Sequence, residues 1–298
     1  MKALTLSRRT CLQGGLLTLC PTIGRAQAAP GRIVVSFSLL ADIVRQIAPP
    51  AFEVQALVGP DADAHVFEPR PADARRLAEA DLVVVNGLGF EGWIDRLIKA
   101  SGYRGTVVVA SRDVQPRSVG GGIDPHAWQD LARTRRYGAT LAAALVDRWP
   151  AQAAVVRQRA ADYDARLAAL DADVRQRLGA VPREQRRVIT SHDAFGYFGR
   201  AYGIRFLSPV GVSNNAEPTA QGVARLIRQL KAEKVPAVFI ENVADSRLIE
   251  RIRSESGAQI GGTLYSDALS KADGPAPSYV QMMRANLDAL RQALSGAD

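Results

Sequence analysis

Short runs of β-branched and aliphatic residues alternate with segments of helical periodicity over most of the chain. Such continuous apolar runs are typical of strands buried on both faces of a parallel sheet. The pattern predicts strands at 33–37, 54–58, 82–85, 106–109, 187–190, 205–207, 237–240 and 259–264. Between them it predicts helices at 39–47, 71–80, 93–100, 219–233, 247–256 and 277–294. This alternation indicates an α/β protein whose parallel sheets are covered by helices.

Residues 150–179 interrupt the alternation, because they contain no strand pattern. Their apolar residues recur mostly at spacings of three and four: Val155, Tyr163, Leu167, Leu170, Val174 and Leu178. This spacing predicts one long amphipathic helix, which at 1.5 Å per residue would reach about 40 Å. We therefore expect two lobes, each a parallel-sheet α/β sandwich, joined by one rigid helix. The expected boundaries are 29–149 for the first lobe, 150–180 for the linking helix and 181–298 for the second lobe.

Residues 1–28 have the composition of an export signal. They contain four basic residues and no acidic residue, and an apolar stretch precedes Ala26-Gln27-Ala28, a small-x-small cleavage site. The pair Arg8-Arg9 resembles a twin-arginine signal, although Cys11 stands where phenylalanine is usual; an ordinary secretory signal is the alternative. We expect a cleavable signal and a periplasmic protein. Leu19 is bulky for the position before a modified Cys20, so no lipid anchor is expected.

The predicted signal also contains both cysteines of the chain, so the remaining protein offers no thiolate ligand and no disulfide. Its removal lowers the 38 basic residues by four to 34, against 30 acidic residues, and the formal net charge falls from +8 to +4. With no lysine- and arginine-rich run, nucleic acid is not an expected partner. Because no run of about 18 apolar residues occurs, no membrane-spanning helix is predicted.

The three histidines of the chain all follow predicted strands. His65 and His126 lie in loops after strands of the first lobe, and His192 comes directly after the strand at 187–190. Open α/β sheets bind ligands beyond the carboxyl ends of their strands. A single loop histidine is commonly a surface residue, but three of them from two lobes indicate a metal site in the cleft between the lobes. Imidazole nitrogen suits zinc and other late first-row metals.

A closed tetrahedral zinc site needs a fourth ligand. Asp267, just past the last predicted strand, is the first candidate. Glu241, at the end of the preceding strand, is the second, and Asp193 is the third. Asp124 has two interpretations: it fixes the tautomer of His126 as an outer hydrogen-bond acceptor, or it caps the helix that follows.

The segments around these residues carry specific motifs. His65 is followed by Phe67, Pro69 and Asp73. The other motifs are Asp124-Pro125-His126-Ala127-Trp128, Thr190-Ser191-His192-Asp193-Ala194-Phe195-Gly196-Tyr197-Phe198 and Tyr265-Ser266-Asp267-Ala268-Leu269-Ser270. Together they resemble the motifs of the metal-binding solute-binding proteins of ABC importers (cluster A-I). The resemblance runs from about Arg32 to the end of the chain.

This resemblance implies two lobes, a rigid linking helix and a metal bound between the lobes. Carried over position by position, it implies the ligands His65, His126, His192 and Asp267. It also implies a membrane permease and a cytoplasmic ATPase as partners. We expect the binding protein itself to be a monomer. We also expect that it is not an enzyme, because a closed four-ligand site leaves no position for an activated water.

Two features bear on the identity of the metal. Many zinc-specific members of the family carry a long histidine- and acid-rich loop before the second ligand, but residues 111–123 contain no histidine. Manganese-specific members often have glutamate in place of the third histidine, whereas this chain has His192. Three nitrogens and one carboxylate favour zinc over manganese, which prefers oxygen. Manganese, or another divalent metal, is the alternative.

Two enzymatic alternatives are open. The run Gly87-Leu88-Gly89-Phe90-Glu91-Gly92 matches GxGxxG after a predicted strand, with Asp113 about 20 residues on, as in a dinucleotide-dependent oxidoreductase. Against it, Glu91 would place a carboxylate where pyrophosphate binds. The other alternative is an exported zinc hydrolase, which needs an open coordination position and a base such as Glu241. We expect instead a periplasmic protein that binds zinc and delivers it to an ABC importer.

Overall fold

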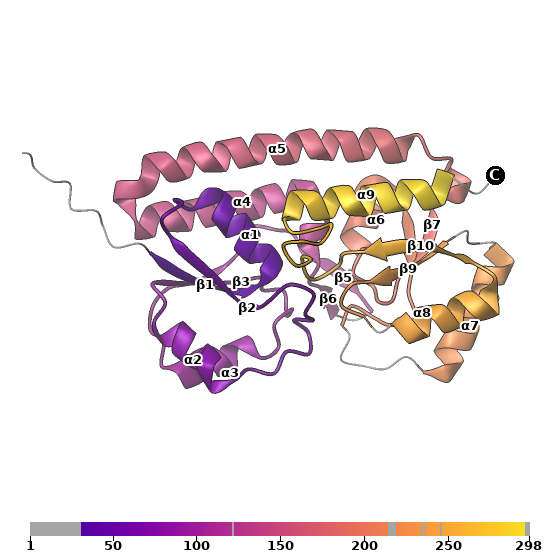
Figure 1. Ribbon diagram of the computed structural model, residues 1–298, viewed down its shortest axis with the longest axis horizontal. Helices are drawn as coiled ribbons and strands as arrows, with labels where there is room; N and C mark the ends of the chain where they lie inside the picture. Colours follow the sequence, from indigo (N-terminus) through magenta and orange to yellow (C-terminus); the bar gives the residue numbers. More distant parts are fainter. Residues whose placement is uncertain are drawn as a thin grey trace, which may run out of the picture.

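The computed structural model describes residues 31–120, 122–213, 219–233, 235, 237–244 and 246–295. The predicted export signal at 1–28 lies outside these residues. The described chain folds into two α/β lobes, each built on a four-stranded parallel sheet (Figure 1). The predicted fold class, two parallel-sheet lobes with a long helix, is therefore confirmed.

The sheet of the N-terminal lobe has the strand order β2-β1-β3-β4. Its strands lie at the predicted positions: β1 (Arg32–Phe37), β2 (Glu53–Val58), β3 (Leu82–Val85) and β4 (Val107–Val109). Ile33 of β1 pairs with Val54 of β2 on one side and with Leu82 of β3 on the other. This central position explains why β1 is apolar and buried along nearly its whole length. The connecting helices are α1 (Ser38–Ile47), α2 (Pro71–Ala78) and α3 (Ile94–Ser101).

The C-terminal lobe repeats this construction with the strand order β10-β9-β7-β8. Its strands are β7 (Arg187–Ile189), β8 (Arg205–Leu207), β9 (Ala237–Glu241) and β10 (Gln259–Leu264). Its predicted helices are observed as α7 (Ala220–Glu233), α8 (Ser246–Ser256) and α9 (Tyr279–Ser295). Because the strands are parallel, the segments that follow β7, β9 and β10 start from the same edge of the sheet.

Several described elements are absent from the prediction. They are α4 (Leu131–Arg148), α6 (Gly196–Tyr202) and the antiparallel hairpin of β5 (Arg117–Val119) with β6 (Gly122–Asp124). Three short 3-10 turns accompany them: η1 (Ala127–Gln129), η2 (Pro150–Gln152) and η3 (Arg183–Gln185). The buried face of α4 includes Thr134, Gly138 and Thr140, so small and polar residues interrupt its apolar periodicity. Helix α6 and the hairpin are too short for any periodic signal.

A single helix, α5 (Ala153–Gly179), runs along both lobes (Figure 1). It packs against α1 and α4 of the N-terminal lobe and against α6 and α9 of the C-terminal lobe. The predicted buried face is correct except at its first position, where Val156 is buried and Val155 is 43% exposed. Val156 lies seven residues before Tyr163, close to two helical turns, which keeps both on one face. None of the described helices, α5 included, is both long and apolar enough to cross a membrane.

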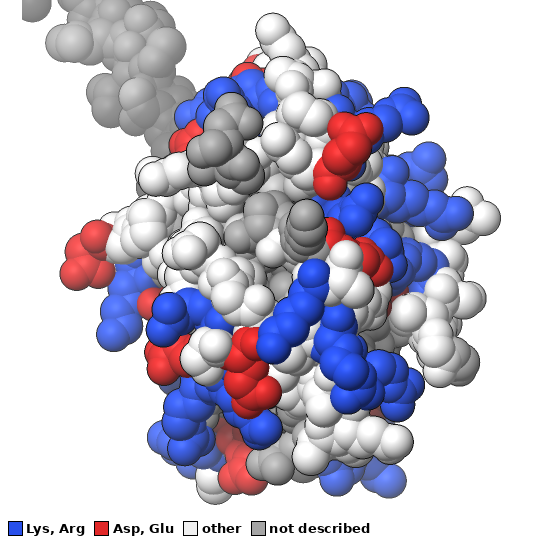
Figure 2. Space-filling model, turned by 90° about the vertical axis from the view of Figure 1, so that its right-hand side faces the viewer, with Lys and Arg blue, Asp and Glu red and all other residues white. Residues whose placement is uncertain are grey.

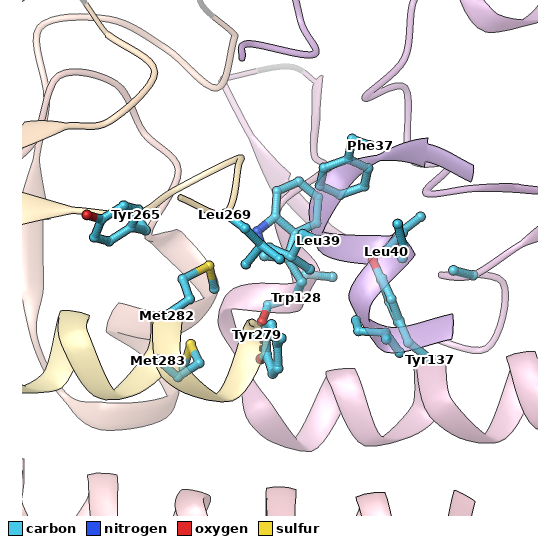
Figure 3. Close-up of a cluster of buried hydrophobic side chains, with 14 of the residues drawn as sticks. Phe37, Leu39, Leu40, Trp128, Tyr137, Tyr265, Leu269, Tyr279, Met282 and Met283 are labelled. Atoms are coloured by element: carbon cyan, nitrogen blue, oxygen red, sulfur yellow. Dashed lines mark hydrogen bonds between the residues drawn. The ribbon is translucent and has the colours of Figure 1, made fainter. Parts of the chain in front are cut away.

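One hydrophobic core continues from the first lobe into the second (Figure 3). The ring of Trp128 lies 5.1 Å from that of Phe37, centroid to centroid, and its indole nitrogen donates to the carbonyl oxygen of Ser266 at 2.9 Å. The hydroxyl of Tyr279 donates to the carbonyl oxygen of Trp128 at 2.6 Å. A smaller apolar cluster lies beneath α7 and α8. The shared core therefore holds the lobes together next to the loops that carry the candidate ligands.

The end of the molecule formed by the C-terminal lobe carries basic and acidic side chains intermingled (Figure 2). Ion pairs of this lobe include Arg205 with Glu233 at 3.1 Å and Arg251 with Glu255 at 2.8 Å. Exposed pairs of this kind contribute little to stability. The fold therefore depends on its buried contacts more than on its surface charges.

We expect Val156→Ala to lower the free energy of unfolding by about 2 kcal/mol, because it removes buried methyl groups and leaves a cavity under α5. Its neighbour gives a matched control: Val155→Ala should change this free energy by less than about 0.5 kcal/mol, since that side chain is largely exposed. Equilibrium unfolding in urea measures both effects. Equal losses would show that α5 presents a different face to the lobes.

Candidate metal centre

The four residues predicted as ligands converge from four separate loops. His65 lies between β2 and α2, His126 between β6 and η1, His192 after β7, and Asp267 between β10 and α9. Each offers one nitrogen or oxygen atom, and these atoms all lie within 4.8 Å of one another. Two loops belong to each lobe, so the cluster exists only where the lobes meet.

Four distances in the cluster are close to the spacing of ligand atoms around one cation. Nε2 of His65 lies 3.4 Å from Oδ2 of Asp267 and 3.3 Å from Nε2 of His126. Nε2 of His126 lies 3.4 Å from Oδ1 of Asp267, and Nε2 of His192 lies 3.1 Å from Oδ2. Two ligand atoms in a tetrahedral zinc site are about 3.3 Å apart, given bonds of about 2.0–2.1 Å. The side chains therefore need little movement to hold such an ion.

Burial makes this arrangement costly without a cation. His65 is 7% exposed, and the other three residues are fully buried. Among the described residues, both carboxylate oxygens of Asp267 and Nε2 of His192 lack an aligned hydrogen-bond partner. A buried carboxylate is strongly disfavoured unless a positive charge lies beside it. A divalent cation at the centre would satisfy these atoms together, so the residues present fit a metal.

Asp124 supports His126 from behind. Oδ1 of Asp124 lies 2.8 Å from Nδ1 of His126 and accepts a hydrogen bond from the backbone N–H of the same residue at 3.0 Å. This contact assigns the ring proton to Nδ1 and leaves the lone pair of Nε2 facing the cluster. The alternative role as a helix cap is not observed: His126 stands at the N-cap of η1, which has no side-chain cap hydrogen bond, and Asp130 caps α4.

Glu241 lies behind His192, but its contact with the imidazole ring is an ion pair and not an aligned hydrogen bond like that of Asp124 with His126. Its Oε2 lies 2.7 Å from Nδ1 of His192, and its Oε1 accepts the backbone N–H of His192 at 2.9 Å. Glu241, the second candidate for the fourth ligand, therefore faces the far edge of the imidazole and not the centre of the cluster.

Asp193, the third candidate, points elsewhere. Its Oδ2 lies 4.0 Å from Nη2 of Arg117, and its backbone N–H donates to the carbonyl oxygen of Gly211. Of the three carboxylates considered, the structure directs only Asp267 toward all three imidazoles.

Aromatic rings enclose the cluster on the side of the N-terminal lobe. The ring of Phe90 packs edge-on against His65 with centroids 4.6 Å apart, and Trp128 lies 5.2 Å from His126. These rings lower the local dielectric and exclude water, which strengthens electrostatic interactions inside. Sequence reasoning assigned no role at the site to Phe90, which lies within GxGxxG, or to Arg117, which carries no sequence signal.

The charges of the cluster perturb its protonation in the metal-free state. Burial opposes a charge on His192, but Glu241 and Asp267 outweigh it and raise the pKa of this imidazole well above its ordinary value. Burial likewise opposes ionisation of Asp267, yet His192 and His126 hold the pKa of that carboxyl well below its usual range. Without metal, the site therefore keeps a proton on His192 beside an ionised Asp267.

The GxGxxG segment does not form a phosphate-binding loop. The carboxylate of Glu91 folds back into the turn and accepts the backbone N–H groups of Asn86 at 2.6 Å and Gly87 at 3.2 Å, and the hydroxyl of Ser36 at 2.6 Å. The following helix, α3, begins only at Ile94. Glu91 thus occupies the amides that a pyrophosphate would need, and the dinucleotide alternative is not supported.

The sequence and the structure are similar to those of known metal-binding proteins. A sequence model of the family described as "zinc-uptake complex component A periplasmic" matches residues 33–293. The manganese-binding lipoprotein MntA of Halalkalibacterium halodurans is 32% identical over 265 residues, which cover 89% of this chain and 88% of that protein. The iron-binding protein YfeA of Yersinia pestis is 32% identical over 265 residues, which cover 87% of this chain and 85% of that protein.

The zinc-binding protein TroA of Treponema pallidum is 33% identical over 281 residues, which cover 90% of this chain and 91% of that protein. Its solved structure matches this one with a TM-score of 0.86 at 31% identity, covering 89% of this chain and 99% of that chain. The similarity therefore extends over both lobes and over all the loops that carry the cluster.

Proposed function

The chain belongs to the family of zinc-uptake complex component A periplasmic proteins, and we propose that the metal it carries is zinc. Members of this family are metal-binding components of ABC transporters and not enzymes. The observation that carries this proposal is the donor set. Three buried imidazole nitrogens face one buried carboxylate at 3.1 to 3.4 Å. The proposed ligands are His65, His126, His192 and Asp267.

The donor chemistry supports zinc over manganese. Similar proteins are described as binding zinc, manganese or iron, so family membership leaves the metal open. Nitrogen donors suit zinc, whereas manganese prefers oxygen, and this site offers three nitrogens. Manganese is the alternative cargo.

The importer supplies the rest of the transport cycle. We propose a membrane permease and a cytoplasmic ATPase as partners, with the binding protein itself a monomer. The proposed domain boundaries are 29–149 and 181–298 for the lobes and 150–180 for the joining helix. A zinc hydrolase is not supported, because the suggested base, Glu241, is engaged with His192.

Export is supported by the periplasmic family description, and we propose that residues 1–28 direct it. The twin-arginine route has no support from the relatives. The relative from Halalkalibacterium halodurans is named a lipoprotein, which runs against the expectation of a protein without a lipid anchor. Cys20 is the residue that such an anchor would use.

The purified protein should bind one Zn²⁺ per chain, and zinc should displace manganese when both ions are present at equal concentration. Metal analysis after dialysis, followed by competition between the two ions, measures both properties. Failure to bind any divalent metal would end the proposed function. Preferential retention of manganese would overturn only the choice of zinc.

Substitution of a ligand should cost more than substitution of its support. Outer-shell partners typically contribute 10- to 100-fold in metal affinity, so we expect Glu241→Gln to fall in that range. His192→Ala removes a donor atom and should weaken zinc binding by more than about 100-fold. Titration against a chelator of known affinity gives both values. Equal losses of zinc affinity in the two variants would indicate that Glu241 binds the metal directly.

Affinity should fall as the pH decreases. Imidazole binds a metal only when it is neutral, and the raised pKa of His192 in the metal-free site means that protons compete already near neutral pH. Asp267 stays ionised throughout this range, since its pKa is lowered. We expect a loss of about tenfold per pH unit for each proton displaced. Chelator competition from about pH 8 to about pH 5 tests this, and a constant affinity would contradict histidine ligation.

A further inference from the structure

Arg117, the first residue of β5, reaches the metal centre through a carboxylate. Its Nη1 lies 2.6 Å from Oδ2 of Asp124, while the other oxygen of Asp124 holds Nδ1 of His126 at 2.8 Å. The carboxylate is fully buried, and the Arg117 side chain is 23% exposed. Arg117, Asp124 and His126 are therefore linked by successive contacts, from the edge of the site to a proposed ligand.

The same guanidinium rests on the C-terminal lobe. A Cβ at Gly196 would lie 2.1 Å from Nη1 of Arg117, so glycine at the start of α6 leaves the space that the guanidinium occupies. The backbone N–H of Arg117 donates to the hydroxyl of Tyr197 at 2.8 Å, and Nη2 lies 4.0 Å from the carboxylate of Asp193. All three neighbours follow His192 in the sequence.

The contact between Arg117 and Asp124 affects how His126 is held. A fully buried carboxylate needs partners for both oxygens, because an uncompensated buried charge is strongly disfavoured. Arg117 supplies the partner for Oδ2 with a short, charge-assisted hydrogen bond. Without it, Asp124 would lose its fixed orientation, and His126 would lose the contact that aims Nε2 at the cluster.

We propose that Arg117 is a positioning residue of the metal centre. Through Asp124 it sets the orientation of His126. Because its guanidinium also packs against Gly196, this orientation depends on the position of the C-terminal lobe. This inference rests on the proposed ligand set. Arg117 itself is not a proposed ligand, and it lies outside both loops of the C-terminal lobe that carry ligands.

The first experiment is a double-mutant cycle on zinc affinity, measured by chelator competition. Arg117→Met should weaken binding about tenfold in the wild-type protein, at the lower end of outer-shell effects. In the Asp124→Asn background the same substitution should change affinity by less than about twofold, because the contact it acts through is already altered. Arg135→Met is the matched control, since Arg135 pairs with exposed Asp164 on α5 and should leave affinity unchanged.

The second experiment displaces Arg117 without removing it. Gly196→Ala puts a methyl group into the space of a flexible guanidinium, so the fold should tolerate it while the contact with Asp124 breaks. We expect Gly196→Ala to weaken zinc binding about as much as Arg117→Met, and to have no effect in an Arg117→Ala background, where the space is free. Gly179→Ala, where a Cβ would meet nothing within 4 Å, is the control.

A spectroscopic readout separates positioning from general stability. With Co²⁺ in place of zinc, the visible bands report the ligand geometry, and they should change in Arg117→Met and Gly196→Ala but not in the two controls. If the wild-type protein binds no metal, the proposed function fails. If it binds metal and both variants match it in affinity and Co²⁺ spectrum, the role of Arg117 alone is overturned.

Discussion

The structure depends on the burial of one carboxylate, that of Asp267, among three imidazole rings. A charge removed from water in this way must be balanced by a cation, and the surrounding donors accept either a divalent metal or a proton on His192. Because the donors come from loops of both lobes, the balancing charge and the meeting of the lobes are thermodynamically coupled. A cation bound at this cluster would therefore also stabilise the contact between the two lobes.

The scaffold also joins the two lobes away from the cluster. Helix α5 packs on helices of both lobes, and the core around Trp128 crosses the boundary between them. Close-packed interiors deform little and prefer discrete arrangements. The lobes are therefore joined by specific packed contacts beside the site, such as that of Arg117 with Tyr197 of the C-terminal lobe.

The sequence was sufficient for the strands, the long helix and the three histidines, because apolar runs and rare histidines are local signals. Asp267 was one of three candidate carboxylates, and the resemblance to the family singled it out. It was not sufficient for α4, where Gly138 and Thr140 on the buried face weaken the periodicity. The choice of Val155 over Val156 shows that spacing alone leaves the phase of a helix uncertain at its end. Arg117 and Gly196 are separated by the whole of α5, and only the folded chain shows that one fills the space left by the other.

The GxGxxG loop shows how a nucleotide motif can serve a metal site. Its tight turn, with left-handed backbone at Gly87, Leu88 and Gly89, brings backbone amides together, but Glu91 satisfies them from within the chain. The turn then supports the ligands. The side chain of Asn86 donates to the carbonyl oxygen of Pro125, next to His126, at 3.0 Å, and Phe90 packs against His65. The carboxylate of Glu91 accepts the hydrogen bonds that a phosphate accepts in a nucleotide-binding loop. The loop instead supports two proposed ligands, His65 and His126.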